Sequence, residues 1–317
     1  MNNTFEQIKE ALQDCETVVV GGHLNPDGDA VGACFGFAYA LQKQGKKVSV
    51  ALEEFPKKYD IIADKELLLP KESDNNIFDA FVALDCGDKE RLGEAKAIFD
   101  RTKLKINIDH HISNTYFGDY NYVDSNASST SEIIYQYLRD EGINQQIASA
   151  LYAGILYDTA AFRHTSTSSM TMMAAAELMT YSIPANKIYT TFFDNRTFSE
   201  LKLLGKAFEK AEKYFNENVI YTFLTQQDIE QCQGTSKEVD SIVNFIKGVE
   251  NIKIACFIYQ KGENEVKASF RSEDGFDVCK LAQNFGGGGH VKAAGCTIYS
   301  SIEKAWQEIQ SKLAELF

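Results

Sequence analysis

The stretch "TVVVGGHLNPDGDAVGACFGFAYALQKQGKK", residues 17–47, decides the fold of this chain. It begins with a β-branched run that ends in glycines, which predicts a strand over residues 17–23. Apolar side chains then recur at helical spacing before a basic end, at Val31, Cys34, Phe35, Ala38 and Leu41. A strand, a polar loop and a helix in this order are typical of an α/β fold.

Further segments continue this alternation. "KKVSVAL" (46–52), "FVALDCGD" (81–88) and "KLKINIDHH" (103–111) predict strands, and the segments 125–142 and 145–162 predict helices. The pattern indicates a mostly parallel sheet with helices on both faces. In such sheets ligands bind beyond the carboxyl ends of the strands.

Polar side chains gather at these predicted strand ends. "NPDGD" by itself is good turn chemistry, and a lone aspartate or histidine there is usually structural. The joint pattern is harder to explain in that way, because three strand ends and the end of the 145–162 helix carry such residues. We expect one cluster of seven: His23, Asp27, Asp29, Asp85, Asp109, His110 and Asp158.

A cluster of carboxylates without compensation is electrostatically costly, and bound divalent cations would relieve that cost. Carboxylate and imidazole ligands without thiolates favour Mn²⁺, Mg²⁺, Co²⁺ or Fe²⁺ over a cysteine-rich zinc site. One aspartate that bridges two ions about 3.5–4 Å apart would build a two-metal centre for phosphoryl chemistry.

The second half of the chain predicts a different domain. Residues 185–216 are charged and helical in pattern, and strands follow at 218–224, 253–260 and 265–272. We therefore expect domains at 1–184 and 217–317 with a helical linker at 185–216. The glycine-rich stretch "FGGGGHVKAAG" (285–295) lets backbone N–H groups approach an anion, and Arg271 can bind a phosphate bidentately.

Composition limits the classes of partner. The chain has 317 residues and a formal net charge of −13, which argues against binding to long duplex or single-stranded nucleic acid. Its seven cysteines form no CxxC pair and indicate reduced, buried thiols. No signal peptide or membrane span is recognisable, so we expect a cytoplasmic protein without a membrane partner. Whether it is a monomer or a homodimer stays open.

In this order, "HLNPDGDAVG", "LDCGD", "IDHH" and "YDT" resemble the four motifs of the DHH phosphoesterase superfamily. "GGGGHVKAAG" is similar to the signature of the DHH-associated substrate domain. The resemblance implies a parallel-sheet α/β domain joined to a smaller mixed-sheet α/β domain. It also implies an enzyme of the subfamily that cuts RNA fragments of about two to five nucleotides to mononucleotides and dephosphorylates pAp to AMP. The limited size of the implied substrate cleft would favour such short substrates.

The resemblance also implies roles for individual residues. Two divalent cations would be bound, Mn²⁺ first and Mg²⁺ or Co²⁺ as alternatives, with Asp85 shared between them. The other metal ligands would be His23 and Asp27 for one ion, and Asp29, His110 and Asp158 for the other. His111 would be catalytic, supported by Asp109. Substrate would be bound by Asn25, Arg271, Gly287, Gly288, Gly289 and His290.

Other functions remain open at this point. A phosphodiesterase for linear or cyclic dinucleotides shares the same motifs, and so do a family II inorganic pyrophosphatase and a RecJ-type exonuclease. The pyrophosphatase carries a different C-terminal domain, and the acidic charge argues against the exonuclease. A non-catalytic nucleotide- or RNA-binding module would lack a metal ligand, whereas every expected ligand is present. Phe162, Arg163 and His164 follow Asp158 and either contact substrate or pack locally.

Overall fold

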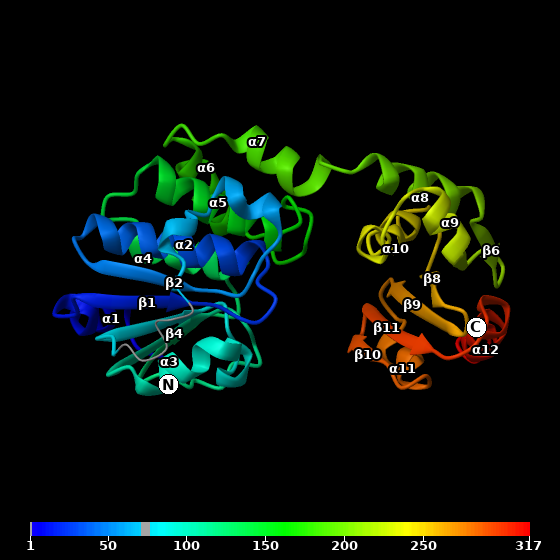
Figure 1. Ribbon diagram of the computed structural model, residues 1–317, viewed down its shortest axis with the longest axis horizontal. Coiled ribbons are helices and arrows are strands. Elements are labelled where there is room, and N and C mark those ends of the chain that lie inside the picture. The colour runs from blue at the N-terminus through cyan, green and yellow to red at the C-terminus, as the bar shows by residue number, and fades with distance from the viewer. Residues whose placement is uncertain (1, 71–76) are drawn as a thin grey trace. The chain divides into compact units, whose positions relative to one another are not determined.

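The computed structural model describes residues 2–70 and 77–317 of the chain. It divides into two compact units, Met1–Asn195 and Arg196–Phe317. Each unit is built on one sheet (Figure 1). No helix in the described ranges combines the length and the apolar character that a bilayer crossing requires.

The first unit holds a five-stranded parallel sheet in the order β2-β1-β3-β4-β5. Its strands are β1 (Thr17–Gly21), β2 (Lys47–Ala51), β3 (Ala80–Leu84), β4 (Leu104–Asp109) and β5 (Tyr120–Val123). Its α-helices are α1 (Phe5–Gln13), α2 (Gly28–Lys43), α3 (Lys96–Arg101), α4 (Thr130–Leu138), α5 (Gln145–Asp158), α6 (Ser169–Met179) and α7 (Ala185–Tyr189). Short 3₁₀ turns are η1 (Lys57–Ile61), η2 (Lys65–Leu67) and η4 (Lys89–Ala95), and a π-helical turn is η5 (Thr190–Asp194).

The parallel sheet is covered on both faces, as its sequence pattern predicts. Val18 and Val20 of β1 pack in one core with α2, α4 and α5, whereas Val19 between them packs in a second core with Phe81 and Phe99. Alternate side chains of a strand point to opposite faces, so a strand buried on both faces is apolar throughout. Figure 1 shows α2, α4 and α5 on one face and α3 on the other.

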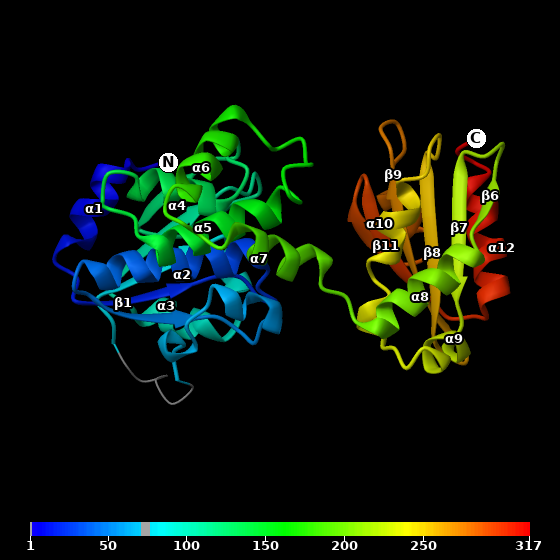
Figure 2. The ribbon, with the colours of Figure 1, turned by 90° about the horizontal axis from the view of Figure 1, so that it is seen from above.

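The second unit holds a mixed six-stranded sheet in the order β10-β11-β9-β8-β7-β6, and only β7 and β8 pair in parallel (Figure 2). Its strands are β6 (Glu212–Tyr214), β7 (Val219–Leu224), β8 (Ile254–Gly262), β9 (Glu265–Ser272), β10 (Gly288–His290) and β11 (Ala293–Ile298). Its helices are α8 (Phe198–Glu209), α9 (Gln226–Gln231), η6 (Ser236–Glu238), α10 (Ile242–Lys247), α11 (Val278–Gln283) and α12 (Ile302–Leu313). Helices α11 and α12 cover one face of this sheet, and α8 and α10 cover the other.

The α/β class and the smaller mixed sheet are confirmed, but the expectation of a helical linker is wrong at its C-terminal end. The predicted helical linker ends in a strand, because Glu212–Tyr214 pairs with β7 as the edge of the second sheet. The glycine-rich stretch forms part of a hairpin, in which Gly288–His290 pairs with Ala293–Gly295. All seven thiols are free, and six of them are buried.

Candidate active site

The loop after β1 combines turn chemistry with ligand placement. Asp27 caps α2, because its Oδ1 accepts hydrogen bonds from the backbone N–H groups of Asp29 (3.0 Å) and Ala30 (3.1 Å). Gly28, between Asp27 and Asp29, lies so close to Tyr157 that a Cβ atom would stand 2.4 Å from the ring. Only glycine fits there, so the cap and the two carboxylates keep one fixed arrangement.

Close packing of α2 against α5 brings two more distant aspartates together. A Cβ atom on Gly32 would lie 2.6 Å from the carbonyl oxygen of Ala150, so the two helices touch through backbone. Asp29 lies in the first turn of α2, and Asp158 is the last residue of α5. The helix pair therefore delivers both carboxylates to the same edge of the sheet.

Asp85 follows β3 in a left-handed conformation, with φ of 53°. Such backbone is uncommon outside glycine and is often found at functional sites. The backbone N–H of Asp85 donates to the carbonyl of Ile108 at 3.2 Å, and the Thr130 hydroxyl donates to its Oδ1 at 3.1 Å. These bonds fix the direction of a carboxylate that is 2 % exposed.

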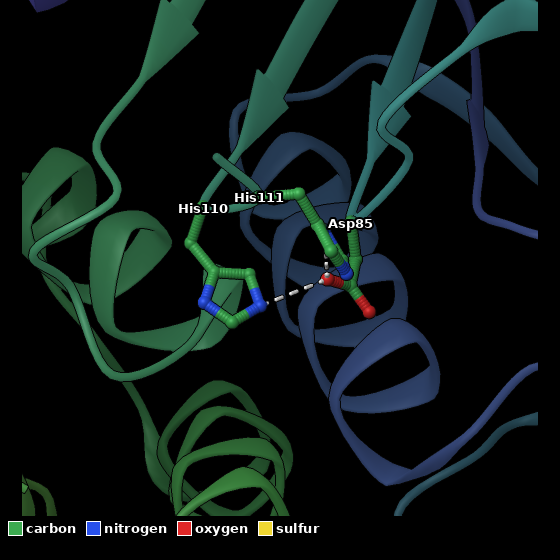
Figure 3. Close-up of side chains that lie close together, drawn as sticks. All are labelled: Asp85, His110 and His111. Carbon is green, nitrogen blue, oxygen red and sulfur yellow. Dashed lines mark ion pairs between the residues drawn. The ribbon is translucent and has the colours of Figure 1, made fainter. Parts of the chain in front are cut away.

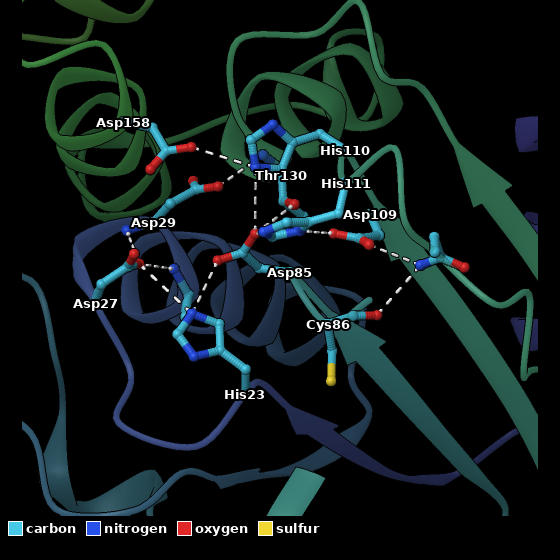
Figure 4. A network of polar contacts seen from close by, with 12 residues as sticks. His23, Asp27, Asp29, Asp85, Cys86, Asp109, His110, His111, Thr130 and Asp158 are labelled. Carbon is cyan, nitrogen blue, oxygen red and sulfur yellow. Dashed lines mark hydrogen bonds and ion pairs between the residues drawn. The ribbon is translucent and has the colours of Figure 1, made fainter. Parts of the chain in front are cut away.

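The two oxygens of Asp85 face two different histidines. Oδ2 lies 3.4 Å from Nε2 of His23, and Oδ1 lies 3.5 Å from Nε2 of His110. His110 in turn lies 3.2 Å from the carboxylate of Asp158 (Figure 4). Asp85 thus stands in the middle of the cluster.

Three groups of side chains in the described ranges could each hold a metal ion, with ligand atoms within 4.8 Å of one another. They are His23, Asp27 and Asp85; Asp29, His110 and Asp158; and Asp85, His110 and His111, the last drawn in Figure 3. All six metal ligands named from the sequence lie in these groups. His111, expected to be catalytic, is an additional member.

The donor set fits divalent cations. Nδ1 of His23 contacts the carbonyl of Leu24 at 2.7 Å, and Nδ1 of His110 contacts the carbonyl of Ala127 at 3.4 Å. If Nδ1 carries the proton in both rings, each Nε2 offers a free lone pair toward the carboxylates. Imidazole nitrogen with several carboxylate oxygens is a ligand set suited to Mn²⁺ and related ions.

His111 belongs to a separate hydrogen-bonded chain. Its Nδ1 lies 2.7 Å from Oδ1 of Asp109, and Asn114 donates to Oδ2 of Asp109 at 2.6 Å. The bond to Asp109 raises the pKa of His111, and although burial alone would raise the pKa of Asp109, the same bond lowers it. Asp109 is fully buried and belongs to none of the three groups, so it orients His111.

Helix α4 is a part of the site that the sequence analysis missed. The backbone N–H groups of Thr130 and Ser131 donate to the two oxygens of Asp29 at 2.7 and 3.0 Å. The positive end of the helix dipole therefore faces this carboxylate. The signal was present in "SNASSTSE" (125–132), a run of capping residues at the start of a predicted helix.

Burial and mutual repulsion disfavour negative charge in the cluster. Burial and the charge of Asp85 raise the pKa of Asp29, and burial with the charges of Asp29, Asp85 and Asp27 raises the pKa of Asp158 to about 10. Burial alone would lower the pKa of His23, but its contacts with Asp27 and Asp85 raise it to about 10. Protons thus balance the carboxylates, and bound cations would take their place.

These shifts predict that the metal-free protein loses stability as the pH rises. Asp158 has a folded pKa of about 10 against 3.8, so its contribution is complete below pH 3.8 and falls as the pH approaches 10. His23 contributes fully below pH 6.5, and its contribution is lost as the pH rises through about 10. We expect the unfolding temperature in EDTA to fall by about 5 °C or more between pH 6.5 and 9.5.

Thermal melts of wild type and Asp158→Asn at several pH values check this expectation. The asparagine mimics the neutral carboxyl, so the variant should be more stable than wild type at pH 9.5 and less sensitive to pH. Excess Mg²⁺ should stabilise wild type most at high pH, where the ligands are deprotonated. An equal pH dependence in both proteins would contradict the assignment of the shift to Asp158.

Other residues singled out from the sequence lie outside the cluster. Asn25 has a φ of 54° and an exposed side chain, and its backbone N–H donates to Glu53 at 3.2 Å. Asp88, the last residue of the sequence motif LDCGD, caps η4 instead of joining the site. His164 is exposed, and Nδ1 of its ring contacts the main-chain oxygen of Asp158 at 3.0 Å.

Phe162 ends a backbone turn that the sequence did not reveal. Ala160, Ala161 and Phe162 have φ values of 46°, 58° and 64°, so three successive residues adopt left-handed backbone after Thr159, the residue that follows Asp158. The ring of Phe162 contacts that of Tyr152 at 6.5 Å between centroids. This turn costs conformational free energy and directs the chain away from α5.

The residues expected to bind substrate in the second unit lie on neighbouring strands. Arg271 pairs with Ala293 in the sheet, and His290 pairs with the same residue from the other side. The guanidinium of Arg271 donates from Nε to Asn244 at 2.9 Å and from Nη1 to the carbonyl of Phe270 at 2.9 Å. Burial lowers the pKa of Arg271.

The glycines of this hairpin have different environments. A Cβ atom on Gly287 would lie 2.3 Å from the carbonyl oxygen of Gly295, and Gly289 has a φ of 145° and a similar close contact. Gly288 has open space around it. Close packing therefore explains two of the three glycines without a ligand.

Comparison with known proteins places the chain in a family. Residues 17–155 match the model of the DHH family N-terminal domain, and residues 216–317 match the DHHA1 domain. The chain is 29% identical to the bifunctional oligoribonuclease and PAP phosphatase NrnA of Thermus thermophilus, over 97% of this chain and 93% of that protein. It is 27% identical to the protein of that name from Bacillus subtilis, over 95% and 94% of the two chains.

A solved structure shows the same fold. The crystal structure of an exopolyphosphatase-related protein from Bacteroides fragilis superposes with a TM-score of 0.87 at 24% identity, covering 98% of this chain and 95% of that one. The two sheets described above and the order of the two matched domains agree with this likeness. The chain therefore belongs to the DHH family of phosphoesterases, with a DHHA1 domain following its DHH domain.

Proposed function

We propose that this phosphoesterase hydrolyses short oligoribonucleotides of about two to five nucleotides to mononucleotides and removes the 3′-phosphate of pAp. The observation that carries the proposal is the position of Asp85, whose two carboxylate oxygens face two separate groups of potential metal ligands. The names of the relatives in Thermus thermophilus and Bacillus subtilis support the substrate class.

The proposed metal ligands divide around Asp85. His23 and Asp27 would hold one divalent cation, and Asp29, His110 and Asp158 would hold the other, with Asp85 shared by both. Mn²⁺ is the proposed ion, and Mg²⁺ or Co²⁺ also suit the donor set. Two such ions, when bound, supply Lewis-acid activation of water and charge stabilisation for phosphoryl transfer.

The protein's own residues would orient the substrate and move protons. His111, held by Asp109 through Nδ1, would present Nε2–H to the leaving oxygen of the substrate and donate that proton. Thr130 would keep the Asp85 carboxylate in its direction. In the second unit, Arg271, the glycines at 287–289 and His290 are the proposed substrate-binding residues, and in the first unit Asn25 is the proposed one.

A time course of RNA cleavage tests the function. Protein freed of metal with EDTA and then loaded with Mn²⁺ or Mg²⁺ is mixed with 5′-labelled RNAs of two to ten nucleotides, with pAp and cyclic dinucleotides as parallel substrates. We expect mononucleotides from the shortest RNAs, AMP from pAp, and no product without metal. Absence of turnover on every substrate with metal would refute the proposal, and preference for cyclic dinucleotides would favour the alternative function.

Replacing Arg271 tests the role of the second unit. The change Arg271→Ala removes a guanidinium that can bind a phosphate bidentately, so KM for pAp should rise about 10- to 100-fold. Asn244→Ala should give a smaller rise of the same kind, because Asn244 holds Nε of Arg271. Arg139→Ala, at an exposed arginine in the first unit, is the matched control. An unchanged KM for Arg271→Ala would exclude Arg271 from substrate binding.

A further inference from the structure

A cavity of about 520 Å³ lies in the first unit and shares one residue with the metal-ligand cluster. His23, whose Nε2 faces Asp85, also lines the cavity wall. The other lining segments follow β1, β2 and β3, so the cavity opens at the carboxyl edge of the parallel sheet. In the sheet, β1 lies between β2 and β3. Helix α2, which follows β1, packs on one face of the sheet, and α3, which follows β3, packs on the other. The carboxyl edge at such a point is the usual place for a ligand in these sheets.

The cavity has an apolar interior. Its lining includes Leu24, Leu52, Leu69, Leu92 and Ile98. Leu92 and Ile98 are almost fully buried and form part of the core under the sheet, whereas the other three are half-buried. A cavity of this volume and character suits a flat organic group of the size of a nucleobase.

Carboxylates surround this interior. Glu53, Glu54 and Glu94 line the cavity, and all three are exposed. Oε2 of Glu53 accepts a hydrogen bond at 3.2 Å from the backbone N–H of Asn25, in the loop that also carries Asp27. One wall of the cavity is therefore tied to the proposed metal-binding loop.

Resting on the function proposed above, we propose that this cavity is a nucleobase subsite that prefers guanine. Three carboxylates repel a phosphate, so a nucleotide can enter only with its base foremost, which leaves its phosphate on the side of His23 and the metal ligands. The apolar walls take the faces of the ring, and the carboxylates accept hydrogen bonds from its edge.

The preference for guanine follows from the edge chemistry of the bases. Guanine presents two neighbouring donors, N1–H and the N2 amino group, which match the two oxygens of one carboxylate. Adenine and cytosine present one amino group. Uracil presents a single N–H between two carbonyl oxygens, and those oxygens repel a carboxylate. The expected order is therefore guanine first and uracil last.

Binding of mononucleotides to metal-free protein tests the subsite without requiring catalysis. Chemical shifts of ¹⁵N-labelled protein are followed during titration with GMP and UMP. We expect shifts at the cavity-lining leucines and about tenfold tighter binding of GMP. The change Ala95→Phe places a ring in the cavity and should weaken GMP binding about tenfold or more, whereas Ala97→Phe, at an exposed position two residues further along the chain in α3, should not.

Kinetics with two dinucleotides give an independent readout. Ala95→Phe should raise KM for pGpG about tenfold with little change in kcat, because the cavity contributes binding and not chemistry. The triple change Glu53→Gln, Glu54→Gln and Glu94→Gln alters only exposed side chains, and it should reduce the preference for pGpG over pUpU. Glu10→Gln, an exposed acid on α1, is its control.

The outcomes separate the subsite from the proposed function. GMP bound with wild-type affinity by Ala95→Phe, GMP shifts located away from the cavity, or an unaltered guanine preference in the triple variant would each overturn the subsite. If neither wild type nor any variant hydrolyses a phosphoester, but GMP still binds in the cavity more tightly than UMP, the proposed activity fails and the subsite stands.

Discussion

Replacing Asp85 by asparagine should lower kcat on pAp and on dinucleotides by about a thousandfold or more. The carboxylate stands between His23 and His110, with one oxygen facing each imidazole. An amide of the same shape removes the negative charge that would be shared by two cations. Loss of several kcal/mol of charge stabilisation in the reaction corresponds to at least this factor in rate.

The neighbouring Asp88 provides the matched control for this variant. It lies in the same loop, but its carboxylate caps η4 by accepting from the N–H groups of Glu90 and Arg91. Asp88→Asn should therefore keep its activity and lose at most about 1 kcal/mol of stability. Metal content measured on both proteins should fall only for Asp85→Asn. Wild-type rates in that variant would refute the two-metal mechanism.

The arrangement of the first unit follows from its sequence because parallel strands impose strong patterns. The expected strands at 17–23, 46–52 and 103–111 lie within about two residues of their observed ends, as expected for segments buried on both faces, whereas the strand expected at 81–88 already ends at Leu84. Leu84 pairs with Ile108, so Asp85 and Asp109 leave neighbouring strands at the same level, which is why the polar strand ends converge. The same reasoning did not find β5, β6, β10 or β11. Of these, Glu212–Tyr214 and Gly288–His290 are too short and too polar to show a period of two.

Contacts that depend on tertiary packing could not be predicted from the sequence. Thr130 and Asn114 stabilise Asp85 and Asp109 by side-chain hydrogen bonds, yet each lies more than four residues from its partner and carries no distinctive motif. The left-handed turn at Ala160–Phe162 contains no glycine, so no residue marks it in advance. From the sequence, Glu53, Glu54 and Glu94 are indistinguishable from solvated surface charges. Only the fold shows that they line the same cavity as His23.

Replacing His111 by glutamine should lower kcat about 100- to 1,000-fold and leave the metal content of the protein unchanged. The expected cause is loss of the proton that His111 would donate from Nε2 while Asp109 holds Nδ1. His110→Gln is the matched comparison, because His110 points Nε2 at Asp85 and Asp158 and should instead lose a metal ion. Metal analysis and single-turnover rates measure the two effects separately.

The leaving group of the substrate decides between two roles for His111, which also lies within reach of a metal group with Asp85 and His110. A nucleotide p-nitrophenyl ester releases a phenolate that needs no proton, so a variant that lacks only a general acid should hydrolyse this ester at close to the wild-type rate. A variant that lacks a metal ligand should lose activity equally on the ester and on pGpG. Because Nδ1 of His111 is occupied by Asp109, which Asn114 holds in turn, we expect the first result. Equal losses on both substrates would make His111 a ligand and leave protonation of the leaving oxygen to water.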